Sequence, residues 1–250
     1  MSSTIDRRGV AGGAWRACAV AAVLLAAVAF VLPAQTAASA APSKETTIEE
    51  LFLKSVEFQI VREKAFSGDY DLKMNALDDL EKKINDGSFA GNDQQVEFVL
   101  EYLAMEGSGS KVREAGRVVN NFPEVRRRAA NLLGRLGTDD ADNALLRVTL
   151  IDDEPIVKAE AVYGLGVIGR NPNGEVVQVL TYAYANEDQA RPDNNLGYAY
   201  CLALEKISKT SGSISDPAAY QLLLKIAQGN YLRTVRTKAL QVLEELKGVK

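Results

Sequence analysis

The sequence predicts an all-α protein in which similar helical units stack into an α-solenoid of about five repeats. Two segments 32 residues apart share one pattern, with apolar residues at offsets of 0, 4, 8 and 11 and a glycine at offset 12. These offsets place the apolar side chains on one stripe of a helix, and the glycine suits a left-handed turn at its end. Such a helix buries its stripe only against neighbours, so a period of about 30 to 50 residues predicts stacked repeats.

The repeated stripe can be followed along most of the chain from its first residue, here termed the anchor. The two matching copies are Val125, Ala129, Leu133, Leu136 and Gly137, and Val157, Ala161, Leu165, Ile168 and Gly169. Two later copies start at Leu196 and Val235, and a degenerate copy at Leu72 continues through Ala76 and Leu80. We therefore expect one helix of each repeat to begin near each anchor.

A second helix is predicted between successive anchors. These helices span residues 139–151, 175–185 and 217–228, and Pro123 and Pro155 each lie two residues before an anchor, where proline suits a first helical turn. Toward the N-terminus we expect a helix over residues 47–65 and another after Asp93, a good helix cap. Each unit is therefore interpreted as a helix pair.

Residues 107–122 interrupt this regular pattern. The interval between Val112 and Val125 is too short for a second helix. Ala115 and Gly116 suit the turn of a small hairpin, but an irregular insert followed by a short helix is the favoured interpretation. The solenoid as a whole is assigned to residues 49–250.

The first 40 residues are typical of an export signal. Arg7, Arg8 and Arg16 precede an uncharged apolar run over residues 17–32, and small residues at 38–40 offer a cleavage site. The run is shorter than the about 20 residues that a membrane span needs. We therefore expect a cleaved signal peptide at 1–40, a linker at 41–48, a periplasmic or secreted mature chain, and no membrane insertion after cleavage. An uncleaved anchor is the alternative.

Charge and composition restrict the chemistry. Residues 1–40 contain three of the 29 basic and one of the 33 acidic side chains, so a mature chain would carry 26 against 32. This acidic excess works against generic binding to nucleic acid or anionic lipid. Histidine is absent from the sequence, which excludes imidazole-based triads and histidine metal sites. Cys201 is interpreted as a small buried residue.

The run from Pro123 to Gly137 resembles a HEAT repeat, in particular the short bacterial type named after phycobilisome lyases, and the run from Pro155 to Gly169 is similar. The resemblance is strong over residues 123–185, fair to the C-terminus and weak over 47–122. It implies a stack of antiparallel helix pairs, in a group whose members mostly bind macromolecules as scaffolds, and it transfers no catalytic residue. The chain departs from the pattern at Tyr200, Ser208 and Lys247.

Three local motifs are assigned structural roles. The glycines at 164, 166 and 169 have the spacing of a dinucleotide loop, but they end a helix, so we expect them to serve helix packing and capping. Acidic clusters at 139–142 and 152–154 are interpreted as helix caps rather than metal ligands. The arginines at 126–128 are interpreted as solvated faces of a helix, with a phosphate or acidic peptide contact as the alternative.

The tyrosines favour an interaction surface. Seven of the nine lie between Tyr163 and Tyr231, and tyrosine is favoured at interfaces because it buries a large area and keeps a polar tip. Tyr200 occupies a stripe position and is assigned to the core. Tyr182 corresponds to Leu150 one repeat earlier, outside the stripe. The residues proposed to bind a partner are Leu150, Tyr182, Arg147 and Gln178.

These observations lead to one functional hypothesis and two alternatives. The hypothesis is an exported, non-enzymatic HEAT-repeat scaffold or adaptor that binds a protein or peptide in the cell envelope, with no catalytic residue, cofactor or metal. The first alternative is a lyase or hydrolase subunit carried on a HEAT-like scaffold. The second, a nucleic-acid-binding solenoid, is opposed by export and by net acidity. The oligomeric state is left open.

Overall fold

The computed structural model describes residues 48–86, 94–212, 214 and 216–248. The predicted signal peptide (1–40), the first seven residues of the linker and the predicted cap Asp93 lie outside the described residues. In the described part of the chain, no helix is long and apolar enough to span a membrane.

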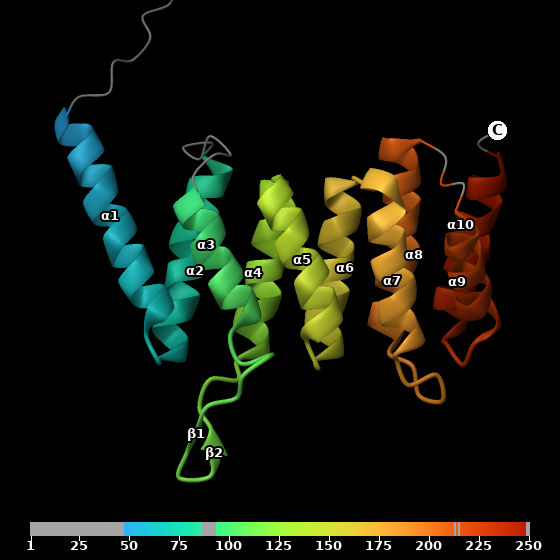
Figure 1. The fold of residues 1–250 in the computed structure, drawn as a ribbon, viewed down its shortest axis with the longest axis horizontal. Helices are drawn as coiled ribbons and strands as arrows, with labels where there is room; N and C mark the ends of the chain where they lie inside the picture. The colour runs from blue at the N-terminus through green and yellow to red at the C-terminus, as the bar shows by residue number, and fades with distance from the viewer. Residues whose placement is uncertain (1–47, 87–93, 213, 215, 249–250) are drawn as a thin grey trace, which may run out of the picture. The chain divides into compact units, whose positions relative to one another are not determined.

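The described residues form ten α-helices, one short 3-10 helix and one small hairpin (Figure 1). The elements are α1 (Ile48–Phe66), α2 (Tyr70–Asn85), α3 (Gln94–Met105), β1 (Arg113–Glu114), β2 (Arg117–Val118), α4 (Pro123–Leu136), α5 (Asp139–Ile151), α6 (Pro155–Ile168), η1 (Pro172–Gly174), α7 (Glu175–Ala185), α8 (Asn194–Ser211), α9 (Pro217–Gln228) and α10 (Arg233–Gly248). The fold is an all-α solenoid, as the sequence predicts.

The helices are arranged in two layers according to whether their numbers are even or odd. Each even-numbered helix from α2 to α10 packs against the next even-numbered one, and the odd-numbered helices do the same more loosely. The anchors Val125, Val157, Leu196 and Val235 lie in α4, α6, α8 and α10, and all four are buried. The repeating stripe therefore forms the core between the two layers.

Small residues allow the even-numbered helices to approach closely. A Cβ atom on Gly134 of α4 would lie 2.7 Å from the Cα atom of Gly164 in α6, and one on Gly166 would lie 2.6 Å from the Cα atom of Ala203 in α8. Both distances are too short for a side chain. The prediction that the glycines of α6 serve packing is confirmed.

The helix ends also follow the predicted chemistry, with one correction. Gly137 and Gly169 end α4 and α6 in the left-handed conformation, with φ of 68° and 72°. Thr138 caps α5 by accepting a hydrogen bond from the Ala141 amide, whereas the acidic residues at 139, 140 and 142 lie in the first turn. The interpretation of these carboxylates as the cap is therefore wrong, although a first-turn position still favours negative charge.

The degenerate copy at Leu72 is confirmed at Ala76 and Leu80, which are buried in α2, but its first position is wrong. Leu72 is 41% exposed, and the neighbouring Lys73 is buried with Ala76 and Leu80. A lysine occupies this interior position because its ammonium group donates to the Ala65 carbonyl at 2.9 Å and pairs with the Glu106 carboxylate at 2.6 Å. At this position a lysine with two polar partners is buried instead of the apolar residue that the pattern predicts.

The insert contains the hairpin that was the less favoured alternative. β1 and β2 pair antiparallel, with Arg113 opposite Val118 and Glu114 opposite Arg117. Ala115 and Gly116 form the turn with φ of 47° and 82°, as a tight two-residue hairpin loop requires. In Figure 1 the hairpin projects beyond the ends of the helices. The helix that follows, α4, has 14 residues and is a full member of its layer.

Arg126 contradicts the interpretation of residues 126–128 as solvated faces. Its side chain is 2% exposed, and its guanidinium donates two hydrogen bonds to Asp152, at 2.6 and 3.2 Å. It also donates to the side chain of Asn121 at 2.8 Å and to the carbonyl of Glu106 at 3.3 Å. Arg126 thus holds both ends of the insert against the turn between α5 and α6, and Asp152 is a partner in a buried ion pair.

Candidate functional site

A shallow hollow of about 370 Å³ lies on the outer surface of α4, α6 and α8. We term it the tyrosine groove. Its lining residues are Arg127, Ile156, Ala159, Glu160, Tyr163, Asn195, Tyr198, Ala199 and Leu202. Aromatic and aliphatic side chains with a few polar groups are typical of protein-binding surfaces.

Helix packing explains why the groove lies between α6 and α8. Gly166 and Ala203 bring the two backbones together, and Ala159 and Ala199 contribute only short side chains to the lining of the groove. The short side chains of Ala159 and Ala199 therefore leave a depression, which the longer side chains of the lining surround. Ile156 is 49% exposed and Tyr198 41% exposed, so apolar surface remains open to solvent.

Ion pairs cross the outer surface between the other even-numbered helices. Arg128 of α4 pairs with Asp78 of α2 at 2.8 Å, and Lys238 of α10 pairs with Glu205 of α8 at 2.6 Å. In the part of the chain that the structure describes, none joins α6 to α8. There, the Lys206 ammonium lies 5.3 Å from the centre of the Tyr163 ring. The groove is thus the apolar interval in a surface otherwise crossed by charges.

The charged edge of the groove is internally neutralised. The Glu160 carboxylate accepts from Arg127 at 3.3 Å and from Asn131 at 2.8 Å. Arg127 also pairs with Glu124 at 2.5 Å, and this hydrogen bond lowers the pKa of Glu124 and raises that of Arg127. Both oxygens of Glu160 are therefore engaged in intramolecular hydrogen bonds.

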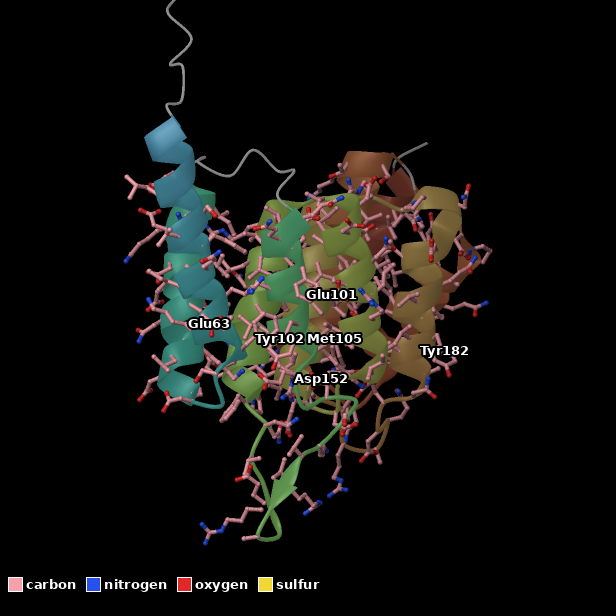
Figure 2. The ribbon with its side chains drawn as sticks, turned by 60° about the vertical axis from the view of Figure 1, so that its left-hand side comes forward. Glu63, Glu101, Tyr102, Met105, Asp152 and Tyr182 are labelled. Carbon is pink, nitrogen blue, oxygen red and sulfur yellow. The ribbon has the colours of Figure 1, made fainter. Side chains whose placement is uncertain are left out.

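The four residues predicted from the sequence lie on a different surface. Arg147 and Leu150 belong to α5, Gln178 and Tyr182 belong to α7, and all four are exposed. Figure 2 shows Tyr182 on the outer side of α7, and its exposed fraction is 65%. We term these residues the odd-layer face. The Arg147 guanidinium pairs with Glu101 of α3, so one of the four already has an intramolecular partner.

Apart from Arg127 at the edge of the groove, the titratable groups with the largest pKa shifts belong to the core. Burial raises the pKa of the Cys201 thiol to about 12, which keeps it protonated and unreactive near neutral pH. Burial also raises the pKa of Tyr200 and Tyr231 well above the ordinary value for tyrosine. The core assignments of Tyr200 and Cys201 are confirmed, since both are fully buried.

The buried charges around the insert have structural roles. Lys73 pairs with Glu106, and Arg126 pairs with Asp152, which Figure 2 labels near the point where the hairpin joins the helices. Tyr102 donates to Glu106 at 3.2 Å. These groups bind one another. Within residues 48–86, 94–212, 214 and 216–248, no group of three or more cysteine or carboxylate side chains is placed to hold a metal ion.

The match to a known family falls on α4 and α5. A family model, the PBS lyase HEAT-like repeat, matches residues 125–149. The match covers one helix pair, starts at the anchor Val125 and extends close to the end of α5. It supports a HEAT-like repeat protein, and α6 and α7 continue the same arrangement. No curated protein matches the chain.

The sequence contains a signal for the groove at an outward position of each repeat, outside the buried stripe. The position six residues after each anchor is Asn131 in α4, Tyr163 in α6, Leu202 in α8 and Gln241 in α10. This outward position is apolar or aromatic only in the two helices that flank the groove. Comparison of outward positions between repeats would have located the groove, whereas comparison of the stripe finds only the core.

Proposed function

We propose that this chain is an exported, non-enzymatic HEAT-like scaffold that binds a protein or peptide segment in the cell envelope through the tyrosine groove. The observation that carries the proposal is the apolar, aromatic interval between α6 and α8 on a surface otherwise crossed by ion pairs. A hollow lined by tyrosine and leucine together with a few charged side chains is typical of a protein-binding site.

The chemistry of the groove supports binding over catalysis. A catalytic acid or base needs a free group with a perturbed pKa in a cleft. The Glu160 carboxylate, which faces the groove, is engaged by Arg127 and Asn131, and the Cys201 thiol is buried in the core. The alternative of a lyase or hydrolase subunit has no comparable support from the groove.

Export rests on the pattern of the first 40 residues. The order of basic residues, an uncharged apolar run and small residues supports a cleaved signal and a mature chain in the periplasm or outside the cell. The scaffold role rests on the HEAT-like repeat itself.

The binding experiment compares one substitution on each candidate surface. The purified chain is used to capture proteins from envelope extract, beside Tyr198→Asp in the groove and Tyr182→Asp on the odd-layer face. A charge in the apolar groove should abolish capture of a specific protein, because burial of an unpaired carboxylate is costly. Tyr182→Asp should retain the same protein.

The reverse result would move the site to the odd-layer face. Retention of the captured protein by both variants would contradict binding through either surface. Thermal melting of both variants serves as the folding control, since both tyrosines are exposed and neither substitution removes core packing.

A further inference from the structure

The two ends of the helical stack differ in surface chemistry. α10 exposes a single large apolar side chain, Leu240, on a helix whose other exposed residues are mainly charged or polar, including Arg236, Glu244 and Lys247. A polar terminal helix is what an end of a repeat stack needs to stay in solvent. Leu224 of α9 and Leu232, just before α10, are also exposed, so the mainly polar surface at this end is that of α10 itself.

The N-terminal end exposes a cluster of large apolar side chains. We define the α1 face as Leu53, Val56, Ile60, Arg62, Glu63 and Leu72, in which the apolar members are 60%, 36%, 51% and 41% exposed in that order. Phe98 of α3, which is 59% exposed, lies beside it. Several apolar side chains gathered on one end are typical of an interaction surface rather than of scattered surface residues.

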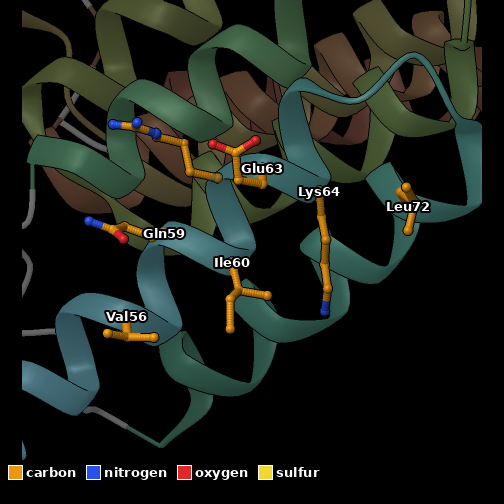
Figure 3. A pocket seen from close by; sticks show the side chains of 7 residues that line it. Val56, Gln59, Ile60, Glu63, Lys64 and Leu72 are labelled. Carbon is orange, nitrogen blue, oxygen red and sulfur yellow. The ribbon is translucent and has the colours of Figure 1, made fainter.

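This face is hollowed on both sides of α1. A hollow of about 570 Å³ between α1 and α2 is lined by Val56, Ile60 and Leu72 among others, and Figure 3 shows these three side chains around it. A smaller hollow of about 230 Å³ contains Phe58, Arg62 and Phe98. α1 therefore forms a ridge between two hollows. Side chains of a helix from another molecule can pack into such hollows.

The α1 face carries one basic and one acidic side chain, so two copies of this face are complementary in charge. Arg62 and Glu63 both line the larger hollow and are exposed. Among the residues that the structure describes, neither forms an ion pair, although Lys64 and Glu57 on the same helix are paired with Asp79 and Lys83. Adjacent unpaired charges of opposite sign satisfy each other when a two-fold axis brings the same surface of a second molecule against them.

We propose that the chain forms a dimer with a second copy of itself through the α1 face, end to end and related by a two-fold axis. Arg62 of each copy then faces Glu63 of the other, and the apolar side chains of the two faces close the hollows. We do not propose head-to-tail growth, because α10 at the opposite end exposes mainly charged and polar side chains. The pairing is independent of the tyrosine groove, which lies on α4, α6 and α8.

The first test measures the molecular mass of the purified full chain by sedimentation equilibrium. We expect a dimer at micromolar concentration, and Ile60→Glu should weaken the dimer by about tenfold or more, because it buries a charge at the centre of the face. Leu240→Glu is the matched control, since Leu240 is 50% exposed at the other end, and it should leave the dimer intact. A monomeric wild-type chain would overturn the proposal, as would an unaffected Ile60→Glu dimer.

The second test exchanges the two unpaired charges. Arg62→Glu and Glu63→Arg should each weaken the dimer, because each creates like charges across the two-fold axis. The double substitution in one chain should restore it. This restoration is specific to a second copy: occupation of the face by residues 1–47 or by another protein predicts a monomer in every variant. Failure of the double variant to recover would contradict the two-fold arrangement.

Discussion

At the scale of single residues, Arg126 joins three segments that are distant in sequence. Its guanidinium bonds to Asn121 after the hairpin, to the carbonyl of Glu106 before it, and to Asp152 in the turn between α5 and α6. A charge 2% exposed is tolerated only when its hydrogen bonds are satisfied in this way. The buried ion pair between Arg126 and Asp152 therefore helps to fix the position of the hairpin.

Removal of Asp152 should destabilise the protein strongly. Asp152→Ala leaves the Arg126 charge buried without its partner, and we expect a loss of about 3 to 5 kcal/mol in the free energy of unfolding, measured by urea denaturation. Asp153→Ala is the matched control, because the neighbouring Asp153 forms an exposed pair with Lys111. That substitution should change stability by less than about 1 kcal/mol. Equal effects would show that the buried pair has no special role.

Tyr200 has a hydroxyl group that is buried without a hydrogen-bond partner among the described residues. Its ring packs edge-on against Tyr184 at 5.8 Å between centroids. Burial of this hydroxyl raises the pKa of Tyr200, so the folded protein retains a proton that the unfolded chain releases near pH 10. The associated stability is present below pH 10 and is lost as the pH rises above it.

Tyr200→Phe should therefore be tolerated at neutral pH and beneficial at high pH. We expect a change within about 1 kcal/mol at neutral pH, because no hydrogen bond is lost. Above pH 10, the variant should lose less stability with rising pH than the wild-type protein, as followed by urea denaturation across an alkaline pH series. Tyr182→Phe, at a 65% exposed position, is the control and should keep the wild-type pH dependence. The same alkaline slope in Tyr200→Phe would contradict the assignment.

At the scale of helices, α6 and α8, which supply most of the lining of the tyrosine groove, are in close contact. The contact requires Gly166, because a Cβ atom there would lie 2.6 Å from the Cα atom of Ala203. The cost of a glycine within a helix is offset by the approach that it permits.

Gly166→Ala should reverse the usual effect of replacing a helical glycine. Such a change commonly stabilises an exposed helix, but here we expect a loss of about 1 to 3 kcal/mol through overpacking, measured as a lower melting temperature. Gly248→Ala at the end of α10 is the control, since a Cβ atom there meets nothing within 4 Å. A neutral Gly166→Ala variant would show that α6 and α8 separate without cost.

Helix positions were predictable where packing repeats, and they failed where buried charge intervenes. The predicted ranges 139–151, 175–185 and 217–228 coincide with α5, α7 and α9, because the apolar period is clear in all three. Lys73 and Arg126 occupy the interior instead of an apolar side chain or a solvated face. Their partners, Glu106 and Asp152, are 33 and 26 residues away, and a local pattern cannot reveal such pairs.

At the scale of the whole molecule, the residues that stabilise the stack differ from the residues proposed to bind partners. The stripe that repeats from α4 to α10 is buried between the layers, while the outward positions differ from helix to helix. The groove, the odd-layer face and the α1 face all arise from outward positions that break the repeat. Sequence repetition therefore identified the solenoid, and the candidate sites lie where repetition ends.

Export can be tested through the fluorescence of the mature protein. Trp15 is the sole tryptophan of the chain and lies within the predicted signal peptide. Protein recovered from the envelope fraction should show tyrosine emission without a tryptophan band. A tryptophan band would show that residue 15 remains attached and would contradict cleavage.

We propose that the tyrosine groove contacts a partner protein in the cell envelope. Photo-crosslinking in cells tests it directly, with a photoreactive amino acid placed at Tyr198 in the groove and, in a second variant, at Tyr182 on the odd-layer face. We predict a discrete adduct with one protein from position 198 and no such adduct from position 182. An adduct from position 182 alone, or from neither position, would contradict the claim.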